Sequence, residues 1–484
     1  MSNNSNKKFY ITTTLPYVNA DPHIGFAAEI VRADIIARYR RLLGDEVFFN
    51  TGTDEHGLKI YRKALEQGID TQTYVDEYAK KFDDLKEALD LSYDNFIRTT
   101  DEHHIKSAQE FWKRCDANGD IYKKNYKIKY CVGCELEKTE SELNEDGCCP
   151  LHPNQELEII EEENYFFKWS NYQKKLLDFY KENPDFVVPD FRLNEIKKFV
   201  ERGLEDFSIS RLKEKMPWGV PVPNDEKHVM YVWFDALVNY ISALGWPEDE
   251  KKFTEFWGTE DYRNAIQVAG KDNLRQQSAM WQAMLMSAGL PLSKQVFIFG
   301  FVNSGGQKMS KSLGNVINPL DLVNEYGTDA VRYYIARHFN TFEDSDFTME
   351  KFKEDYNANL ANGLGNLTSR IMKMAESHLN DPVKIKAFAI PESGKEYLNN
   401  MELNHYLDYI WTNISYTDNL IQKTEPFKMI KTNREAAQEI IIGLVERLYE
   451  VSVLLEPVMP ETAKKIQQAI KENKMPSEPL FLRK

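Results

Sequence analysis

The order of apolar and polar residues in the first 57 positions predicts a strand, a helix and a second strand. Residues 8–19, KFYITTTLPYVN, are β-branched and aromatic, which is typical of a buried strand. In residues 27–44 apolar side chains recur at helical spacing until Gly44 ends the helix: Val31, Ile35, Tyr39 and Leu42. Residues 45–57, DEVFFNTGTDEHG, indicate another strand that runs into a polar loop. This order is a βαβ unit, so we expect an α/β doubly wound, Rossmann-like sheet.

The βα rhythm is interrupted in the middle of the chain. From about residue 120 to 225, a cysteine cluster and the Pro-rich stretch MPWGVPVPND replace it. Segments 228–241 and 264–273 resume the rhythm, and residues 294–302 indicate the last core strand. We therefore expect the sheet domain to be split by an insertion.

The last part of the chain is predicted to be all-α. From residue 353 only helical periods occur, and the amphipathic runs 404–423 and 433–471 are typical of a helix bundle. A length of 484 residues suits about three domains.

Composition describes an ordinary globular protein, with 42% apolar and 28% charged residues. The formal net charge of −15 does not favour nucleic-acid binding, so such a partner would need a local basic surface. The N-terminus lacks the apolar core of a signal peptide, and no run approaches the roughly 18 apolar residues of a membrane span. We expect a cytoplasmic protein without membrane contact.

The cysteines predict a metal site. Four of the five cysteines lie within residues 131–149, as C-x2-C at Cys131 and Cys134 and C-x2-H at Cys149 and His152. Three thiolates and an imidazole favour one tetrahedral zinc ion, and a closed set of four ligands implies a structural role. Cys148 is the alternative to Cys149, but only Cys149 keeps the two-residue spacing. The competing interpretation is a set of small buried residues.

Two short segments have the composition of an anion site. In PHIGF, His23 and Gly25 lie where the first strand leads into the first helix, and free N–H groups there attract phosphate. The loop GQKMSKSLGN, residues 306–315, carries Lys308 and Lys311 between glycines. Each has a plainer interpretation, a capping histidine and a solvated turn. Together they favour a phosphate clamp.

PHIGF and KMSKS (308–312) resemble the two signatures of class I aminoacyl-tRNA synthetases, the first of which normally reads His-Ile-Gly-His. The chain from about residue 9 to 484 resembles the methionyl-tRNA synthetases within that class. The further matching segments are LPYVN (15–19), TDEHG (53–57), the zinc knuckle, EEENYFF (161–167), SISR (208–211), WGVPVP (218–223), YVWFDA (231–236) and GKDN (270–273).

The resemblance implies ATP-dependent activation of L-methionine to methionyl-adenylate and transfer of methionine to the 3′ end of its cognate tRNA. The substrate supplies the nucleophile, so positioning and charge stabilisation matter more than a basic side chain. His23, Gly25, Lys308, Ser310 and Lys311 match residues that bind ATP, and His23 and both lysines match catalytic positions. Mg2+ should accompany ATP.

The resemblance also assigns the substrate pocket. Asp54 matches the carboxylate that receives the α-ammonium group, and Asp272 matches a contact to the adenylate ribose. The residues that match the methionine side-chain pocket are Leu15, Tyr17, Trp233, Gln276 and Gln277. By composition alone these aromatic residues would be ordinary core, and Asp54 a cap at a strand end.

Four residues of the helical part match the family's anticodon readers: Asn366, Arg370, Pro426 and Phe427. Asn366 and Arg370 are four apart, hence on one helix face, and both side chains can read base edges. Phe427 stands where the family has a stacking Trp. The alternative is a surface pair and a turn proline.

The resemblance divides the chain into a catalytic domain (1–120 and 228–303), a connective insertion with the zinc knuckle (121–227), a KMSKS loop and stem-contact region (304–352) and an anticodon-binding domain (353–484). The chain ends soon after the bundle, without the domain that dimerises some members, so we expect a monomer.

Three departures leave other interpretations open: Phe26 for the second histidine, Gln276-Gln277 for Phe-His, and Phe427 for Trp. One alternative is a non-catalytic tRNA-binding relative. The other is an active class I enzyme for a different amino acid. The intact KMSKS, Asp54 and Asp272 oppose the first, and Tyr17 and Trp233 oppose the second.

Overall fold

The computed structural model describes residues 7–134, 136–138, 142–309 and 314–484. The chain divides into two compact units, each assembled from several stretches. Unit 1 comprises Met1–Pro22, Gly44–Asp84 and Tyr93–Phe299; unit 2 comprises His23–Leu43, Leu85–Ser92 and Gly300–Lys484. The first helix, α1 (Ile24–Leu42), therefore belongs to a different unit from the strands that precede and follow it.

A six-stranded parallel sheet organises unit 1, in the order β3-β2-β1-β12-β13-β7. Its strands are β1 (Lys8–Thr12), β2 (Glu46–Thr53), β3 (Asn95–Arg98), β7 (Val187–Val188), β12 (Ala265–Gly270) and β13 (Gln295–Phe299). β1 and β12 pair at the centre, where the strand order changes direction. The predicted doubly wound fold is confirmed.

The insertion builds its own antiparallel sheets. One has the order β5-β4-β6-β8: β4 (Ile121–Cys131), β5 (Leu136–Lys138), β6 (Glu158–Phe167) and β8 (Phe207–Ser208). The other has the order β10-β11-β9: β9 (Ser210–Leu212), β10 (Pro221–Val222) and β11 (Asp225–Met230).

One expectation for this region needs correction. Segment 228–241 does not supply a strand to the main sheet, because its first residues belong to β11 and the rest form α8 (Val232–Ala236) and α9 (Asn239–Ser242). The edge strand β7 comes instead from within the insertion and pairs with β13. Two residues are too few to produce a periodic pattern, so the sequence gives no signal for β7.

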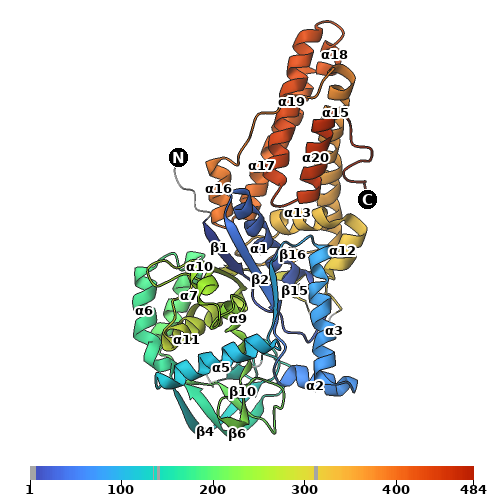
Figure 1. The fold of residues 1–484 in the computed structure, drawn as a ribbon. Coiled ribbons are helices and arrows are strands. Elements are labelled where there is room, and N and C mark those ends of the chain that lie inside the picture. The colour runs from blue at the N-terminus through green and yellow to red at the C-terminus, as the bar shows by residue number, and fades with distance from the viewer. Residues whose placement is uncertain (1–6, 135, 139–141, 310–313) are drawn as a thin grey trace. The chain divides into compact units, whose positions relative to one another are not determined.

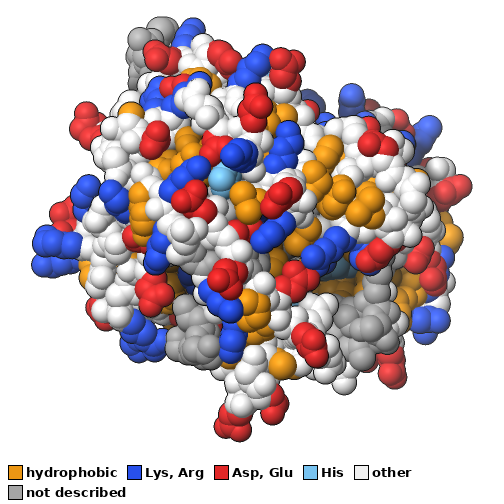
Figure 2. Space-filling view, turned by 90° about the horizontal axis from the view of Figure 1, so that it is seen from below, with side chains coloured by type: hydrophobic (Ala, Val, Ile, Leu, Met, Phe, Trp, Pro, Cys, Tyr) orange, Lys and Arg blue, Asp and Glu red, His pale blue; other side chains and the backbone are white. Residues whose placement is uncertain are grey.

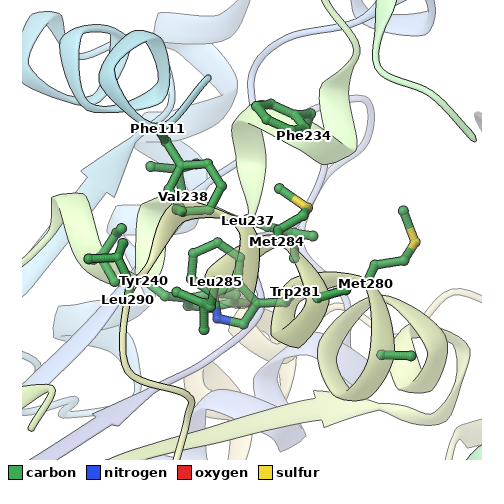
Figure 3. Packing of buried hydrophobic residues seen from close by; sticks show 14 of the residues in the cluster. Phe111, Phe234, Leu237, Val238, Tyr240, Met280, Trp281, Met284, Leu285 and Leu290 are labelled. Carbon is green, nitrogen blue, oxygen red and sulfur yellow. The ribbon is translucent and has the colours of Figure 1, made fainter. Parts of the chain in front are cut away.

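Apolar side chains of the sheet and of the surrounding helices form the core of unit 1, part of which is drawn in Figure 3. Trp281 is fully buried, with the ring of Phe111 stacked on it at 5.5 Å between centroids and the ring of Tyr240 at 5.9 Å. The other helices of unit 1 are α2 (Leu58–Gln67), α3 (Thr71–Asp83), α5 (Glu102–Ala117), α6 (Gln173–Glu182), α7 (Asp190–Glu201), α10 (Glu250–Phe256) and α11 (Trp281–Ala288), with short turns η2 (Trp169–Tyr172) and η3 (Lys271–Asn273) and a π-helix η4 (Gln276–Met280).

Unit 2 is mainly helical, as predicted for the end of the chain. Besides α1 it contains α4 (Leu85–Ala88), α12 (Pro319–Tyr326), α13 (Thr328–His338), α14 (Met349–Asp355), the π-helix η6 (Tyr356–Gly365), α15 (Asn366–His378), α16 (Glu392–Asn399), α17 (Leu403–Thr424), α18 (Pro426–Met429), α19 (Arg434–Leu455) and α20 (Pro460–Glu472). A small sheet of β14 (Val302–Ser304), β15 (Gln307–Lys308) and β16 (Ser345–Phe347) joins them.

Helices α15, α17, α19 and α20 form the predicted bundle (Figure 1). The run expected over 433–471 is two helices, because α19 ends at Leu455 and α20 begins at Pro460. Proline has no N–H for an intrahelical bond but suits the first position of a new helix.

A buried ion pair connects several elements of unit 2. Arg332 on α13 lies 2.8 Å from the carboxylate of Asp34 on α1, and both side chains are fully buried. The same guanidinium donates to the carbonyls of Pro457 and Val458, between α19 and α20, and to that of Leu89. This one side chain therefore links α1 to the end of the bundle.

No helix in the described part of the chain is long and apolar enough to cross a membrane. On the face drawn in Figure 2, Lys and Arg side chains are interspersed with Asp and Glu.

Candidate active site and metal centre

Tyr17 and Asp54 lie side by side beyond the carboxyl ends of β1 and β2. They form an isolated parallel bridge in which the Asp54 N–H donates to the Pro16 carbonyl (3.0 Å) and the Val18 N–H donates to the Asp54 carbonyl (3.2 Å). Asp54 is 6% exposed. Leu15, two residues before Tyr17, is half-buried. Ligands of doubly wound proteins bind at this edge of the sheet.

Trp233 lies on α8 and is half-buried. Both Trp233 and Tyr17 pack against a small buried cluster of Tyr130, Tyr231 and Val232. The Trp233 indole N–H is buried and has no hydrogen-bond partner within the described residues.

Gln276 and Gln277 begin the π-helix η4, an element often found at functional sites. Both side chains are almost fully buried. The Gln277 amide nitrogen donates to the Tyr240 hydroxyl, and its amide oxygen accepts from the Gln267 amide at 3.2 Å. The resemblance does not reveal this network, because Phe and His at these positions could not make the same bonds.

Asp272 follows β12 directly, on the turn η3, and its side chain is exposed. β12 is the sheet's central partner of β1, so Asp272 also belongs to the carboxyl edge of the sheet.

Two further residues, His56 and Asp235, contact the segments at this edge of the sheet. Both lie in segments that resemble the family, but the sequence did not predict a role for either. His56 follows Asp54 by two residues, and its ring Nδ1 lies 3.0 Å from the Asp235 carboxylate on α8. The Tyr17 hydroxyl donates to the His56 carbonyl at 2.6 Å. A single charged residue inside the otherwise apolar stretch YVWFDA was the available signal for Asp235.

In unit 2, His23 is the N-cap of α1. Its Nδ1 accepts a hydrogen bond from the Gly25 N–H at 3.0 Å, so a neutral ring carries its hydrogen on Nε2. Burial lowers the pKa of His23, and the positive charge of Lys308 lowers it further, which favours that neutral ring. Capping and phosphate binding are therefore compatible, because they use different nitrogens.

Lys308 ends β15 and is exposed, with its ammonium 5.3 Å from the centre of the Phe301 ring. The next residue, Met309, approaches Gly25, where an added Cβ would lie 3.6 Å from its Cε. Unit 2 thus brings the start of the KMSKS segment near the N-terminus of α1. Ser310 and Lys311 lie outside the described residues. Phe26 is half-buried in the first turn of α1.

The ligand atoms of Cys131, Cys134, Cys149 and His152 all lie within 4.8 Å of one another. Gly133 is required between the first two cysteines, because a Cβ there would lie 2.6 Å from the His152 ring. Cys149 is fully buried in the cluster. The Cys148 thiol points instead toward the Asp146 carbonyl, at 3.9 Å. The set predicted from the spacing is therefore brought together, and it could hold a metal ion.

The residues predicted to read the anticodon lie on α15 and α18 of unit 2. Asn366 is exposed at the start of α15, and Arg370, one turn later, pairs with the Asp418 carboxylate on α17. Pro426 is buried at the start of α18, whereas the Phe427 ring is 44% exposed.

Comparison with known proteins identifies the chain. The family described as "tRNA synthetases class I (M)" matches residues 9–156 and 149–372. The methionine–tRNA ligase of Thermotoga maritima is 42% identical over 97% of this chain and 76% of its own, and that of Synechocystis sp. is 39% identical over 97% and 91%. The structure of Mycobacterium tuberculosis methionyl-tRNA synthetase in complex with methionyl-adenylate superposes with a TM-score of 0.89, at 37% identity, over 95% of this chain and 93% of that one.

The parallel sheet, the carboxylates at its edge and the family match together define a class I aminoacyl-tRNA synthetase. Within this class, the chain belongs to the methionyl-tRNA synthetase family. The resemblance seen in the sequence is confirmed.

Proposed function

We propose that the protein is a methionine–tRNA ligase. It activates L-methionine with ATP to methionyl-adenylate and pyrophosphate, and transfers the methionyl group to the 3′ end of tRNA(Met). The observation that carries the proposal is the pairing of Asp54 with Tyr17 at the carboxyl edge of the sheet, in a chain that belongs to this family almost throughout.

Charging of a tRNA(Met) transcript with labelled methionine tests both steps together. The natural protein should charge this transcript and should charge a transcript with an altered CAU anticodon far more slowly. Absence of charging with folded protein and active transcript would contradict the proposal.

Asp54 receives the α-ammonium group of methionine, because a buried carboxylate is an effective partner for a cation. The rings of Tyr17 and Trp233, with Leu15, surround the thioether chain, since a polarizable sulfur packs favourably against aromatic rings. These contacts place the methionine carboxylate for attack on the α-phosphorus of ATP.

His23 donates its Nε2–H to a phosphate oxygen, and Gly25 leaves room for the nucleotide at the N-terminus of α1, where the helix dipole favours negative charge. Lys308 and Lys311, with Ser310, stabilise negative charge as it moves onto pyrophosphate. Asp272 binds the adenylate ribose. Mg2+ would accompany ATP and would supply further positive charge to the phosphates.

Gln277 has one amide hydrogen for the Tyr240 hydroxyl and a second that can donate to the thioether sulfur. Gln276 lacks the sulfur–aromatic attraction of the usual Phe, about 0.3–1.5 kcal/mol. We therefore expect methionine to be preferred over norleucine, but about 2- to 10-fold less strongly than in a Gln276→Phe/Gln277→His variant. Pyrophosphate exchange with both amino acids measures the preference, and equal selectivity in the two proteins would contradict this account of the pocket.

The metal that Cys131, Cys134, Cys149 and His152 hold is one structural zinc ion per chain. Three thiolates and an imidazole within 4.8 Å match the donors and geometry that zinc prefers. Such thiols persist in a reducing compartment, which supports a cytoplasmic location.

Asn366 and Arg370 read anticodon bases, with the exposed Phe427 ring as a stacking platform. The pairing of Arg370 with Asp418 fixes the guanidinium beside α17 before tRNA arrives. Arg370→Ala should therefore weaken charging of tRNA(Met) while leaving methionine activation unchanged.

A further inference from the structure

A buried hydrogen bond joins the segment after β2 to helix α8. The Nδ1 atom of His56 lies 3.0 Å from Oδ2 of Asp235, and the two residues are 4% and 0% exposed. Burial raises the pKa of Asp235, but the neighbouring His56 and His104 outweigh burial and hold it below its ordinary value. The carboxylate is therefore ionised, and His56 donates to it through Nδ1–H.

The opposite side of Asp235 faces a second histidine. Nε2 of His104 lies 3.7 Å from Oδ1, and Nδ1 of His104 lies 2.9 Å from the Ser242 hydroxyl on α9. The carboxylate thus sits between two imidazoles, but its hydrogen bond is the one from His56 to Oδ2, because 3.7 Å is too long for a hydrogen bond to Oδ1.

The backbone of His56 continues the connection toward the candidate methionine pocket. Its carbonyl accepts from the Tyr17 hydroxyl at 2.6 Å, and Tyr17 is bridged to Asp54. Asp235 lies two residues after Trp233 on the same helix. One buried chain therefore links the three segments that carry Tyr17, Asp54 and Trp233.

We propose that His56 and Asp235 are positioning residues for the amino-acid pocket, holding Asp54, Tyr17 and Trp233 in fixed relation through the His56–Asp235 bond. The inference rests on the proposed function of those three residues. A binding group placed on loops needs such support, because a small displacement of Asp54 weakens its contact with the ammonium group. A buried charge is costly unless it is paired, so loss of the His56 hydrogen bond should disturb the position of Asp235 and of α8.

The test compares three replacements of His56 by pyrophosphate exchange. An Asn side chain places its amide nitrogen near the position of Nδ1, whereas Gln reaches the position of Nε2 and Ala reaches neither. We expect His56→Gln and His56→Ala to raise KM for methionine about tenfold, with KM for ATP and kcat much less affected. His56→Asn should stay within about twofold of the natural KM.

Ser287→Ala provides the matched control, because the Ser287 hydroxyl donates to the buried Asp120 carboxylate at 2.8 Å, among residues that have no proposed role in binding. It should lower thermal stability without changing KM for methionine. The inference would be overturned if His56→Gln had the same KM for methionine as the natural protein. It would also be overturned if His56→Asn and His56→Gln changed this KM equally. If His56→Ala does not fold, the Asn and Gln pair still decides. Absence of methionine-dependent exchange in the natural protein would instead refute the proposed function, and this inference with it.

Discussion

Gly25→Ala is expected to disable the phosphate site while leaving the fold intact. An ideal Cβ at Gly25 would lie 2.8 Å from Cε1 and 2.9 Å from Nδ1 of His23, closer than carbon and ring atoms approach. The backbone of α1 accepts alanine, so the imidazole must move instead. The bond from the Gly25 N–H to Nδ1 is then lost, and Nε2–H no longer points in its original direction.

The expected effects on stability and on catalysis differ in size. Loss of the N-cap bond costs about 0.5–2 kcal/mol, but alanine is favoured over glycine within a helix by about 0.8–1.0 kcal/mol. The net change in stability should therefore be small. A misdirected donor to developing negative charge costs about 2.7–4 kcal/mol, which lowers kcat about 10²- to 10³-fold.

Pyrophosphate exchange at saturating methionine, with thermal unfolding of the same samples, measures both effects. Gly443→Ala is the matched control, since a Cβ on this glycine of α19 meets no atom within 4 Å. Gly443→Ala should unfold at the same temperature as the natural protein or slightly higher, and it should exchange pyrophosphate at the same rate. If Gly25→Ala exchanges within threefold of the natural protein, His23 is only a helix cap.

Three further outcomes are expected. Lys308→Ala should slow exchange about 10²- to 10³-fold while methionine affinity hardly changes, and a near-natural rate would refute its role in charge stabilisation. Elemental analysis should find one zinc per chain in the natural protein and in Cys148→Ala but none in Cys149→Ala; retention of zinc by Cys149→Ala would show that the ligand set is wrong. Arg332→Met removes one of the two guanidinium groups that pair with the buried Asp34 carboxylate, and Arg38 remains at 2.8 Å, so urea unfolding should show a loss of about 1.5–3 kcal/mol; a loss below about 0.5 kcal/mol would contradict the importance of the Arg332 pair.

The features that the sequence predicted well are local in the chain. Spacing alone predicted that Cys131, Cys134, Cys149 and His152 lie together, because each pair of ligands is separated by only two residues. Apolar periodicity likewise predicted α1, since nineteen residues of helix produce a long pattern. The strand predicted over residues 8–19 is correct only in its first part, because β1 ends at Thr12 and Tyr17 forms only an isolated bridge with Asp54.

The features that were missed depend on distant partners. His56 and Asp235 are 179 residues apart, so no local pattern relates them, although both lie in segments that resemble the family, TDEHG and YVWFDA. Gln277 on η4 is hydrogen-bonded to Gln267 on β12 and to Tyr240 in the core of unit 1. Other members of the family have His at this position, so the resemblance does not predict these bonds. Neither periodicity nor resemblance contains that information.

Pyrophosphate exchange with a panel of amino acids tests the central claim most directly. The panel should contain methionine, leucine, isoleucine, valine and cysteine, each with ATP and purified, zinc-replete protein. The account predicts rapid exchange with methionine and far slower exchange with every other amino acid. Exchange supported best by another amino acid, or by none, would contradict it.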